Sequence, residues 1–126
     1  MHFTDKELAA VMKLGIDMLM ADGKIHENEE NTIGIELAKF VKDENKFDLV
    51  SGLSMSMDSA VAISIVATMD EEEKRHVAAF LAFIMISDGD TDPRELALLK
   101  MVSLLASFPE MTVKECIDNW KKWAKK

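Results

Sequence analysis

Apolar residues recur at every third or fourth position along most of the chain, which is the spacing of one buried helix face. This pattern predicts helices over residues 5–20, 27–42, 47–52, 59–68, 71–86 and 93–107, with a last one starting near residue 112. A polar connection over residues 43–46 precedes the short third helix, which Gly52 is expected to stop. The Val, Ile, Thr and Ser residues of the middle region also suit strands, but two helices fit the interval better than an isolated hairpin. We therefore expect an all-α fold of about seven helices in a single domain.

Residues that cap helix N-termini mark three of these starts. In a capping box, the first residue accepts a hydrogen bond from the backbone three positions later, and the side chain at that position accepts one in return. The three pairs are Thr4 with Glu7, Asp70 with Glu73, and Thr112 with Glu115. The helix after Asp70 is apolar on every side from Val77 to Ile86, so we expect other helices to surround it at the centre of the fold.

One helix-bend-helix unit occurs twice, with an offset of 66 residues. The aligned pairs are Glu7 with Glu73, Val11 with Val77, Leu14 with Phe80, Met18 with Ile84, Leu19 with Met85, Asp22 with Asp88, Gly23 with Gly89, Glu29 with Glu95 and Ile33 with Leu99. A helix commonly ends at a residue in the left-handed conformation, which glycine adopts without strain. Gly23 and Gly89 are therefore expected to end the first helix of each unit.

The bends of the two units, residues 21–29 and 87–95, carry six carboxylates that are candidate metal ligands. They are Asp22, Glu29, Asp88, Asp90, Asp92 and Glu95. Asp22 and Glu29 have the spacing of the second half of an EF-hand loop, but Met18 and Met20 occupy two positions that need oxygen ligands, which excludes a true EF-hand. If the hairpins pack side by side, the carboxylates crowd one end of the molecule. There they either bind Ca²⁺ or Mg²⁺ or serve only as helix caps and Asx turns.

The two bends resemble the TerB-like family, which includes the tellurite-resistance protein TerB and a domain of membrane-anchored DnaJ-like co-chaperones. The matching segments are Ala21-Asp22-Gly23-Lys24-Ile25 with Glu29, and Ser87-Asp88-Gly89 with Glu95, each after an apolar helix. The resemblance covers nearly the whole chain. It implies an all-helical bundle with pseudo-twofold hairpins, an acidic metal-binding surface and a part in bacterial stress-response complexes. Thr91 departs from the pattern, which prefers an aliphatic residue there, and no role in tellurite resistance follows.

Composition adds to this picture mainly through charge. The 126 residues are 48% hydrophobic and carry a formal net charge of −8, which suits one cored domain and argues against wrapping of nucleic acid. Cations or a basic partner fit this charge better. The N-terminal residues lack a signal-peptide pattern, the longest apolar run is about half of a membrane span, and a lone Cys116 gives no intramolecular disulfide. We therefore expect a cytoplasmic protein.

The C-terminal helix offers a different candidate site. It places Trp120 and Trp123 on its apolar stripe and adds Lys121 and Lys122. This combination suits an anionic membrane surface or a partner groove, although such a stripe also packs on the bundle of its own chain. The sequence shows no phosphate loop, Ser/His/Asp set or Cys/His pair. This absence predicts a non-enzymatic protein. Together with the stress-response role that the TerB-like resemblance implies, we expect an adaptor with an acidic surface and an unidentified protein partner, or alternatively a peripheral membrane or protein-docking module.

Overall fold

The computed structural model describes residues 3–20, 44–86, 93–109, 114, 115 and 118, and these residues form helices without strands. The helices are α1 (Asp5–Met20), α3 (Glu44–Met55), α4 (Ser59–Ala67), α5 (Glu71–Ile86) and α6 (Pro93–Leu105). The all-α prediction is confirmed for this part of the chain, with five helices rather than about seven. The helix predicted over residues 27–42 and most of the C-terminal one lie outside the described residues.

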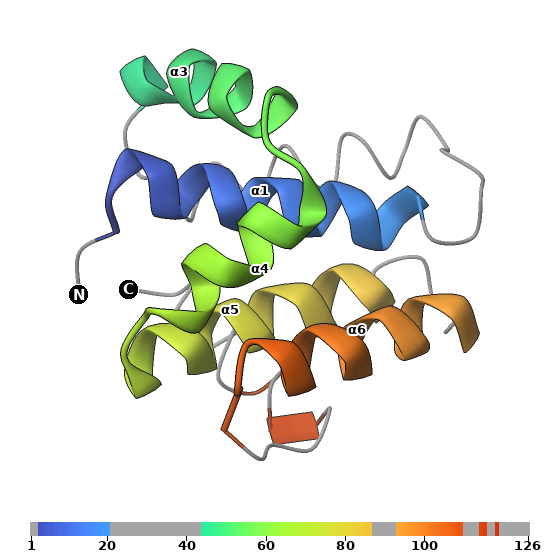
Figure 1. Ribbon diagram of the computed structural model, residues 1–126. Coiled ribbons are helices and arrows are strands. Elements are labelled where there is room, and N and C mark those ends of the chain that lie inside the picture. Colours follow the sequence, from blue (N-terminus) through green and yellow to red (C-terminus); the bar gives the residue numbers. More distant parts are fainter. Residues whose placement is uncertain (1–2, 21–43, 87–92, 110–113, 116–117, 119–126) are drawn as a thin grey trace.

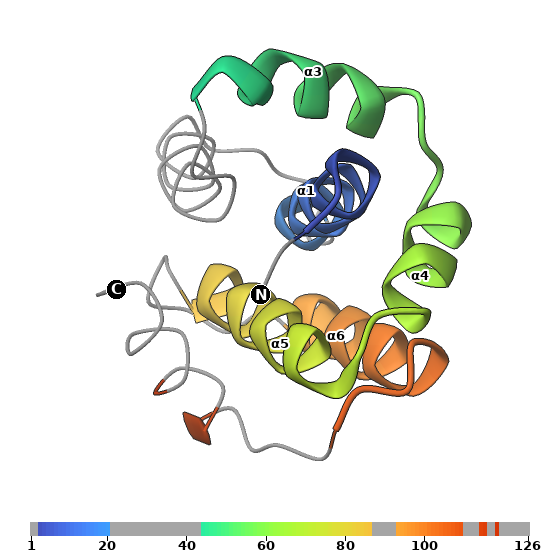
Figure 2. The ribbon, with the colours of Figure 1, turned by 90° about the vertical axis from the view of Figure 1, so that its left-hand side faces the viewer.

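Helix α1 lies in the middle of the described helices (Figures 1 and 2). It packs against α3, α4, α5 and α6. Seen along α1, α3 lies on one side, the α5 and α6 pair lies on the opposite side, and α4 lies beside them (Figure 2). We expected α5 at the centre, yet α1 touches more of the described helices. Consecutive residues Leu8 to Met12 are all buried, so α1 too is covered on every side over this turn.

Two of the three predicted capping boxes lie in the described residues, and both are formed. Both α1 and α5 begin with a capping box. The backbone N–H of Thr4 donates to Glu7 Oε1 at 2.9 Å, and that of Glu7 donates to Thr4 Oγ1 at 3.1 Å. The same two bonds join Asp70 and Glu73, at 3.1 and 2.8 Å. Equivalent positions of the two units therefore start their helices by the same interaction.

Six apolar positions that the sequence aligns in pairs belong to the core. Their side chains are at most 2% exposed, and they are Val11, Leu14 and Met18 of α1 with Val77, Phe80 and Ile84 of α5. Burial continues around α5 from Val77 to Leu81, each at most 5% exposed, whereas Phe83 is only partly buried. The first part of the apolar stretch is therefore covered on every side.

The extent of α3 corrects two predictions. Residues 44–46, expected in a connection, are helical, and the helix passes Gly52 to end at Met55. Glutamate and lysine are good helix formers, so a polar segment without proline is no barrier to a helix. Glycine ends a helix only where the backbone must turn left-handed; within a helix it costs about 1 kcal/mol relative to alanine. Packing of Val50, which is fully buried, offsets this cost.

Helix α6 ends in a Schellman motif close to the predicted end at residue 107. The N–H of Phe108 donates to the carbonyl of Ser103 at 2.9 Å, and the N–H of Ser107 donates to that of Leu104 at 3.3 Å. Ser107 adopts φ 56°, the left-handed conformation that this motif requires. Phe108 then packs against the core.

Within the described ranges, no single helix is long and apolar enough to cross a membrane. The segments Asp48–Met55 and Ser59–Ala67 meet the same criteria only as a pair, with a bend of 117° between them.

Candidate functional site

A pocket of about 420 Å³ lies where the start of α1, the end of α3 and the start of α4 meet. Its lining residues are Asp5 and Lys6 of α1, Leu53 of α3, Ser56, Met57 and Asp58 of the connecting turn, and Val61 of α4. Three segments that are separate in the sequence thus build one concave surface. Its volume is at the low end of the range for ligand pockets.

Local hydrogen bonds fix the turn between α3 and α4. Asp58 is the N-cap of α4, with an extended backbone and with Oδ1 accepting from the N–H of Val61 at 2.8 Å. On the α3 side, Ser56 Oγ donates to the carbonyl of Leu53 at 3.0 Å, and the N–H of Met57 donates to that of Ser54 at 3.3 Å. These bonds satisfy backbone groups that have no hydrogen-bond partner within the helix at its ends. The turn that forms one wall of the pocket is therefore held by local hydrogen bonds.

A second interaction holds α4 against α1. Ser59 Oγ donates to Asp17 Oδ2 at 2.6 Å, and the other oxygen of Asp17 pairs with Lys13 Nζ at 3.0 Å. The Lys13 and Asp17 side chains are only 25% and 18% exposed. The first turn of α4, which carries Val61 into the pocket, therefore has a defined position on α1.

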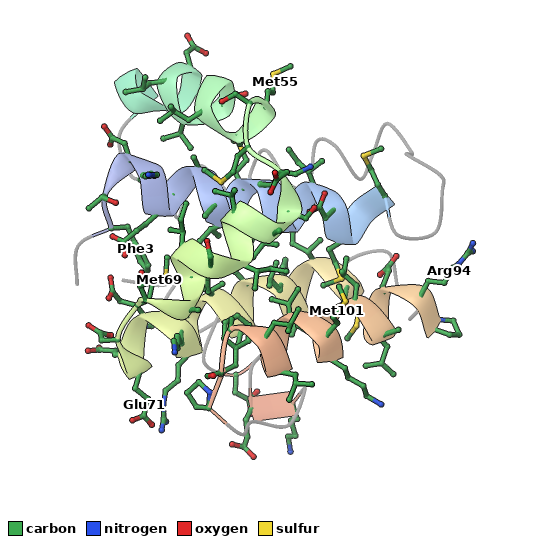
Figure 3. The ribbon with its side chains drawn as sticks, viewed as in Figure 1. Phe3, Met55, Met69, Glu71, Arg94 and Met101 are labelled. Atoms are coloured by element: carbon green, nitrogen blue, oxygen red, sulfur yellow. The ribbon has the colours of Figure 1, made fainter. Side chains whose placement is uncertain are left out.

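Apolar side chains extend the pocket along α3. Leu53 is 36% exposed and Val61 is 42% exposed, and Leu49, 53% exposed, precedes Leu53 by one helical turn on the same face. Together with Met57, they form what we call the α3–α4 apolar surface, defined as Leu49, Leu53, Met57 and Val61. Figure 3 shows Met55, 83% exposed, projecting away from the body of the molecule. It lies about 200° around α3 from Leu53 and belongs to another face.

Charged groups line the same pocket. Asp5 and Asp58 contribute two carboxylates, and Lys6 contributes one ammonium group. Asp58 and Lys6 are exposed and Asp5 is half-buried, so Asp58 and Lys6 are the more open to a partner in solution. An apolar floor beside two carboxylates favours a ligand that is itself part apolar and part cationic.

Among the six predicted metal ligands, the structure describes Glu95 alone. It lies in the first turn of α6 and is only 4% exposed. Asp22, Glu29, Asp88, Asp90 and Asp92 lie outside the described residues. Helices α1 and α5, which lead into the two bends, pack on each other and end at the same side of the molecule (Figure 1). Within the described part of the chain, His, Cys, Asp and Glu form no group of three that could hold a metal ion.

The predicted contact residues of the C-terminal helix, Trp120, Lys121, Lys122 and Trp123, also lie outside the described residues. Their role stays a prediction.

Sequence reasoning missed the α3–α4 pocket. The one available signal was the segment from Ser54 to Asp58, whose Ser and Asp residues predict a helix cap but do not show that Asp5 and Lys6 lie beside it.

Comparison with known proteins places the chain in a family. No family model matches the sequence, and no curated protein matches it. The crystal structure of a protein of unknown function from Porphyromonas gingivalis W83 does match, with a TM-score of 0.84 and 42% sequence identity. The match covers 96% of this chain and 92% of that one. The chain belongs to the same family as this Porphyromonas gingivalis protein. The relationship extends over nearly the full length of both chains, and the relative's function is itself unknown.

Proposed function

We propose that the protein is a non-enzymatic, TerB-like adaptor of the cytoplasm that binds another protein at the α3–α4 apolar surface. The observation that carries this proposal is the pocket beside exposed Leu49, Leu53 and Val61. Large apolar side chains that are grouped at a concave surface mark interaction sites more often than isolated exposed ones do. The doubled acidic bends support the TerB-like assignment, and through it a part in a stress-response complex.

The rigidity of this surface supports the proposal further. The N-cap by Asp58 and the bond from Ser59 to Asp17 hold the start of α4 in place on α1 before a partner arrives. A preformed surface loses less conformational entropy on binding than one that must be ordered. The surface is therefore suited to a specific protein contact.

Site-directed photocrosslinking in the native cell tests the proposal. A benzophenone amino acid at position 53 is expected to crosslink to a defined partner protein. The matched control is position 104, because Leu104 of α6 is also an exposed helical leucine, 80% exposed, but lies away from the pocket lining. Identical crosslinks from both positions, or none from position 53, would contradict the proposal.

A second candidate function is binding of Ca²⁺ or Mg²⁺ at the acidic bends. The arrangement of α1 and α5 favours it, because these two helices precede the bends in the sequence, pack on each other and end at the same side of the molecule (Figure 1). Titration of either ion is expected to give saturable backbone NMR shifts confined to residues 21–29 and 87–95. The double variant Asp22→Asn/Asp88→Asn should lose them. Absence of localised shifts in the wild type would exclude this function.

A further inference from the structure

We propose that the partner segment bound at the α3–α4 apolar surface is a basic amphipathic helix. Its aliphatic side chains lie on Leu53 and Val61, and its Lys or Arg side chains pair with Asp5 and Asp58. This inference rests on the proposed function, because it names the kind of partner that the same surface takes.

The shape of the surface supports a helical partner. Leu49 and Leu53 are one turn apart on α3, and Val61 continues the apolar surface across the pocket onto α4. The apolar area is therefore elongated, with a depression at one end. An amphipathic helix presents aliphatic side chains at intervals of three and four residues, which matches such a strip. The described residues offer no strand edge for an extended peptide.

The charges of the pocket select a basic partner. Asp5 and Asp58 outnumber Lys6 among the lining residues, and the chain as a whole carries a net charge of −8. Asp58 uses Oδ1 for the N-cap of α4, but a carboxylate has about four acceptor sites, so the cap leaves room for a second donor. Cationic side chains next to the apolar anchor would therefore gain ion pairs and faster association.

The same charges argue against a second copy of this chain and against a membrane as the occupant of the surface. A second copy of this chain brings another net charge of −8, which opposes self-association. An anionic membrane repels the carboxylates of Asp5 and Asp58, whereas membrane-binding surfaces use clusters of Lys and Arg. A basic helix is repelled neither by the net negative charge of the protein nor by the carboxylates of the pocket.

NMR titration of the full-length protein tests the inference with three synthetic peptides. Each has about 15 residues, the length at which an isolated helix becomes marginally stable. The first has Leu at helical spacing with Lys beside it, the second has the same residues in shuffled order, and the third has Glu in place of Lys. The first is expected to shift the backbone signals of residues 5–6 and 53–61 saturably, and to bind more tightly than the other two.

Substitutions separate the apolar and ionic contributions. Leu53→Ser is expected to weaken binding about tenfold or more, while the control Leu104→Ser leaves it unchanged. Asp58→Asn keeps the N-cap, because asparagine caps helices as well as aspartate does, and is expected to weaken binding about threefold by loss of an exposed charge. Lys6→Glu should strengthen binding by a similar factor of about three. Circular dichroism of each variant verifies that it is folded.

The outcomes distinguish this inference from the proposed function. Equal binding of the Glu or the shuffled peptide would overturn the basic amphipathic helix, as would shifts confined to other residues or no saturable shifts. If position 53 still crosslinks to a partner in the cell, the proposed function stands without this inference. Self-association, or binding to anionic vesicles, that Leu53→Ser abolishes would assign the surface to a second copy or to a membrane and also overturn the inference.

Discussion

Single side chains stabilise the starts of several helices in this protein by accepting backbone N–H groups. Thr4 and Asp70 are equivalent in the repeat, and each accepts a backbone N–H at the start of its helix. Asp58 does the same at α4. Two further residues, Glu73 and Ser107, are each in an environment that lowers the stability of the folded state, and each gives a testable prediction.

The pKa of Glu73 links stability to pH. Partial burial raises this pKa above its ordinary value of 4.5, and the neighbouring carboxylates of Glu7 and Asp70 add to the rise, while the hydrogen bond from the Asp70 backbone lowers it. The folded state therefore holds this proton more tightly than the unfolded state. Below 4.5 both states are protonated and there is no penalty. As pH rises through the folded-state pKa, the charged form costs the folded protein stability.

Glu73→Gln removes this titration but keeps an acceptor for the N–H of Asp70. The free energy of unfolding of the variant, relative to wild type, is expected to increase between a pH below 4.5 and neutral pH. Urea unfolding followed by circular dichroism at both pH values measures the difference. An unchanged or decreasing difference would show that the folded state does not disfavour the charged form.

Ser107 has a left-handed backbone, with φ 56°. A side chain in this conformation costs roughly 1 to 2 kcal/mol, which glycine avoids. Glycine also increases the entropy of the unfolded chain, which offsets part of the gain. Ser107→Gly is therefore expected to raise the free energy of unfolding by up to about 1 kcal/mol. A lower melting temperature by calorimetry would contradict this account of the α6 end.

At the scale of elements, α3 shows how packing overrides a local preference. The helix includes Gly52 because Val50, two residues earlier, is buried against the core. Gly52 still lowers stability, because glycine loses more conformational entropy than alanine when the helix forms. No atom lies within 4 Å of a Cβ placed on Gly52, so a methyl group fits there.

Gly52→Ala is therefore expected to stabilise the protein by about 0.5 to 1 kcal/mol. Ala60, an exposed residue of α4, provides the reverse control, because Ala60→Gly should destabilise by a similar amount if it behaves as a helical position. Thermal unfolding of both variants measures the effects. Destabilisation by Gly52→Ala would mean that α3 needs a backbone shape at this position that alanine disfavours.

At the scale of the whole molecule, α1 and α5 place the positions that the sequence alignment pairs in the same core. Phe80 of α5 is fully buried, and its equivalent Leu14 of α1 is 2% exposed. The first helices of both units thus direct their aligned residues into one interior. The surface where α3 and α4 meet carries the pocket and the exposed residues Leu49, Leu53 and Val61.

Phe80→Ala is expected to reduce the free energy of unfolding by about 3 to 5 kcal/mol, because it removes buried surface and leaves a cavity. Domains of ordinary stability have about 5 to 15 kcal/mol in total, so the variant should be close to unfolding at physiological temperature. The exposed Leu104 should tolerate alanine within about 0.5 kcal/mol. Similar losses at the two positions by urea unfolding would show that Phe80 is not part of a tightly packed core.

The sequence by itself determined where most helices start and which of their faces are buried. The predicted bounds of α1 and the starts of α4, α5 and α6 agree with the structure. These features are local, since capping pairs such as Asp70 with Glu73 lie three residues apart and apolar spacing repeats within one turn.

The tertiary structure alone decided the central position of α1, the continuation of α3 past Gly52 and the existence of the α3–α4 pocket. Each of these depends on contacts between residues far apart in the chain. Ser59 reaches Asp17 across 42 positions, and the pocket joins Lys6 to Leu53 and Val61. The local sequence pattern cannot show such contacts, because a buried helix face does not specify which other helix packs on it. It also does not show where the packing of helices leaves a pocket for a partner.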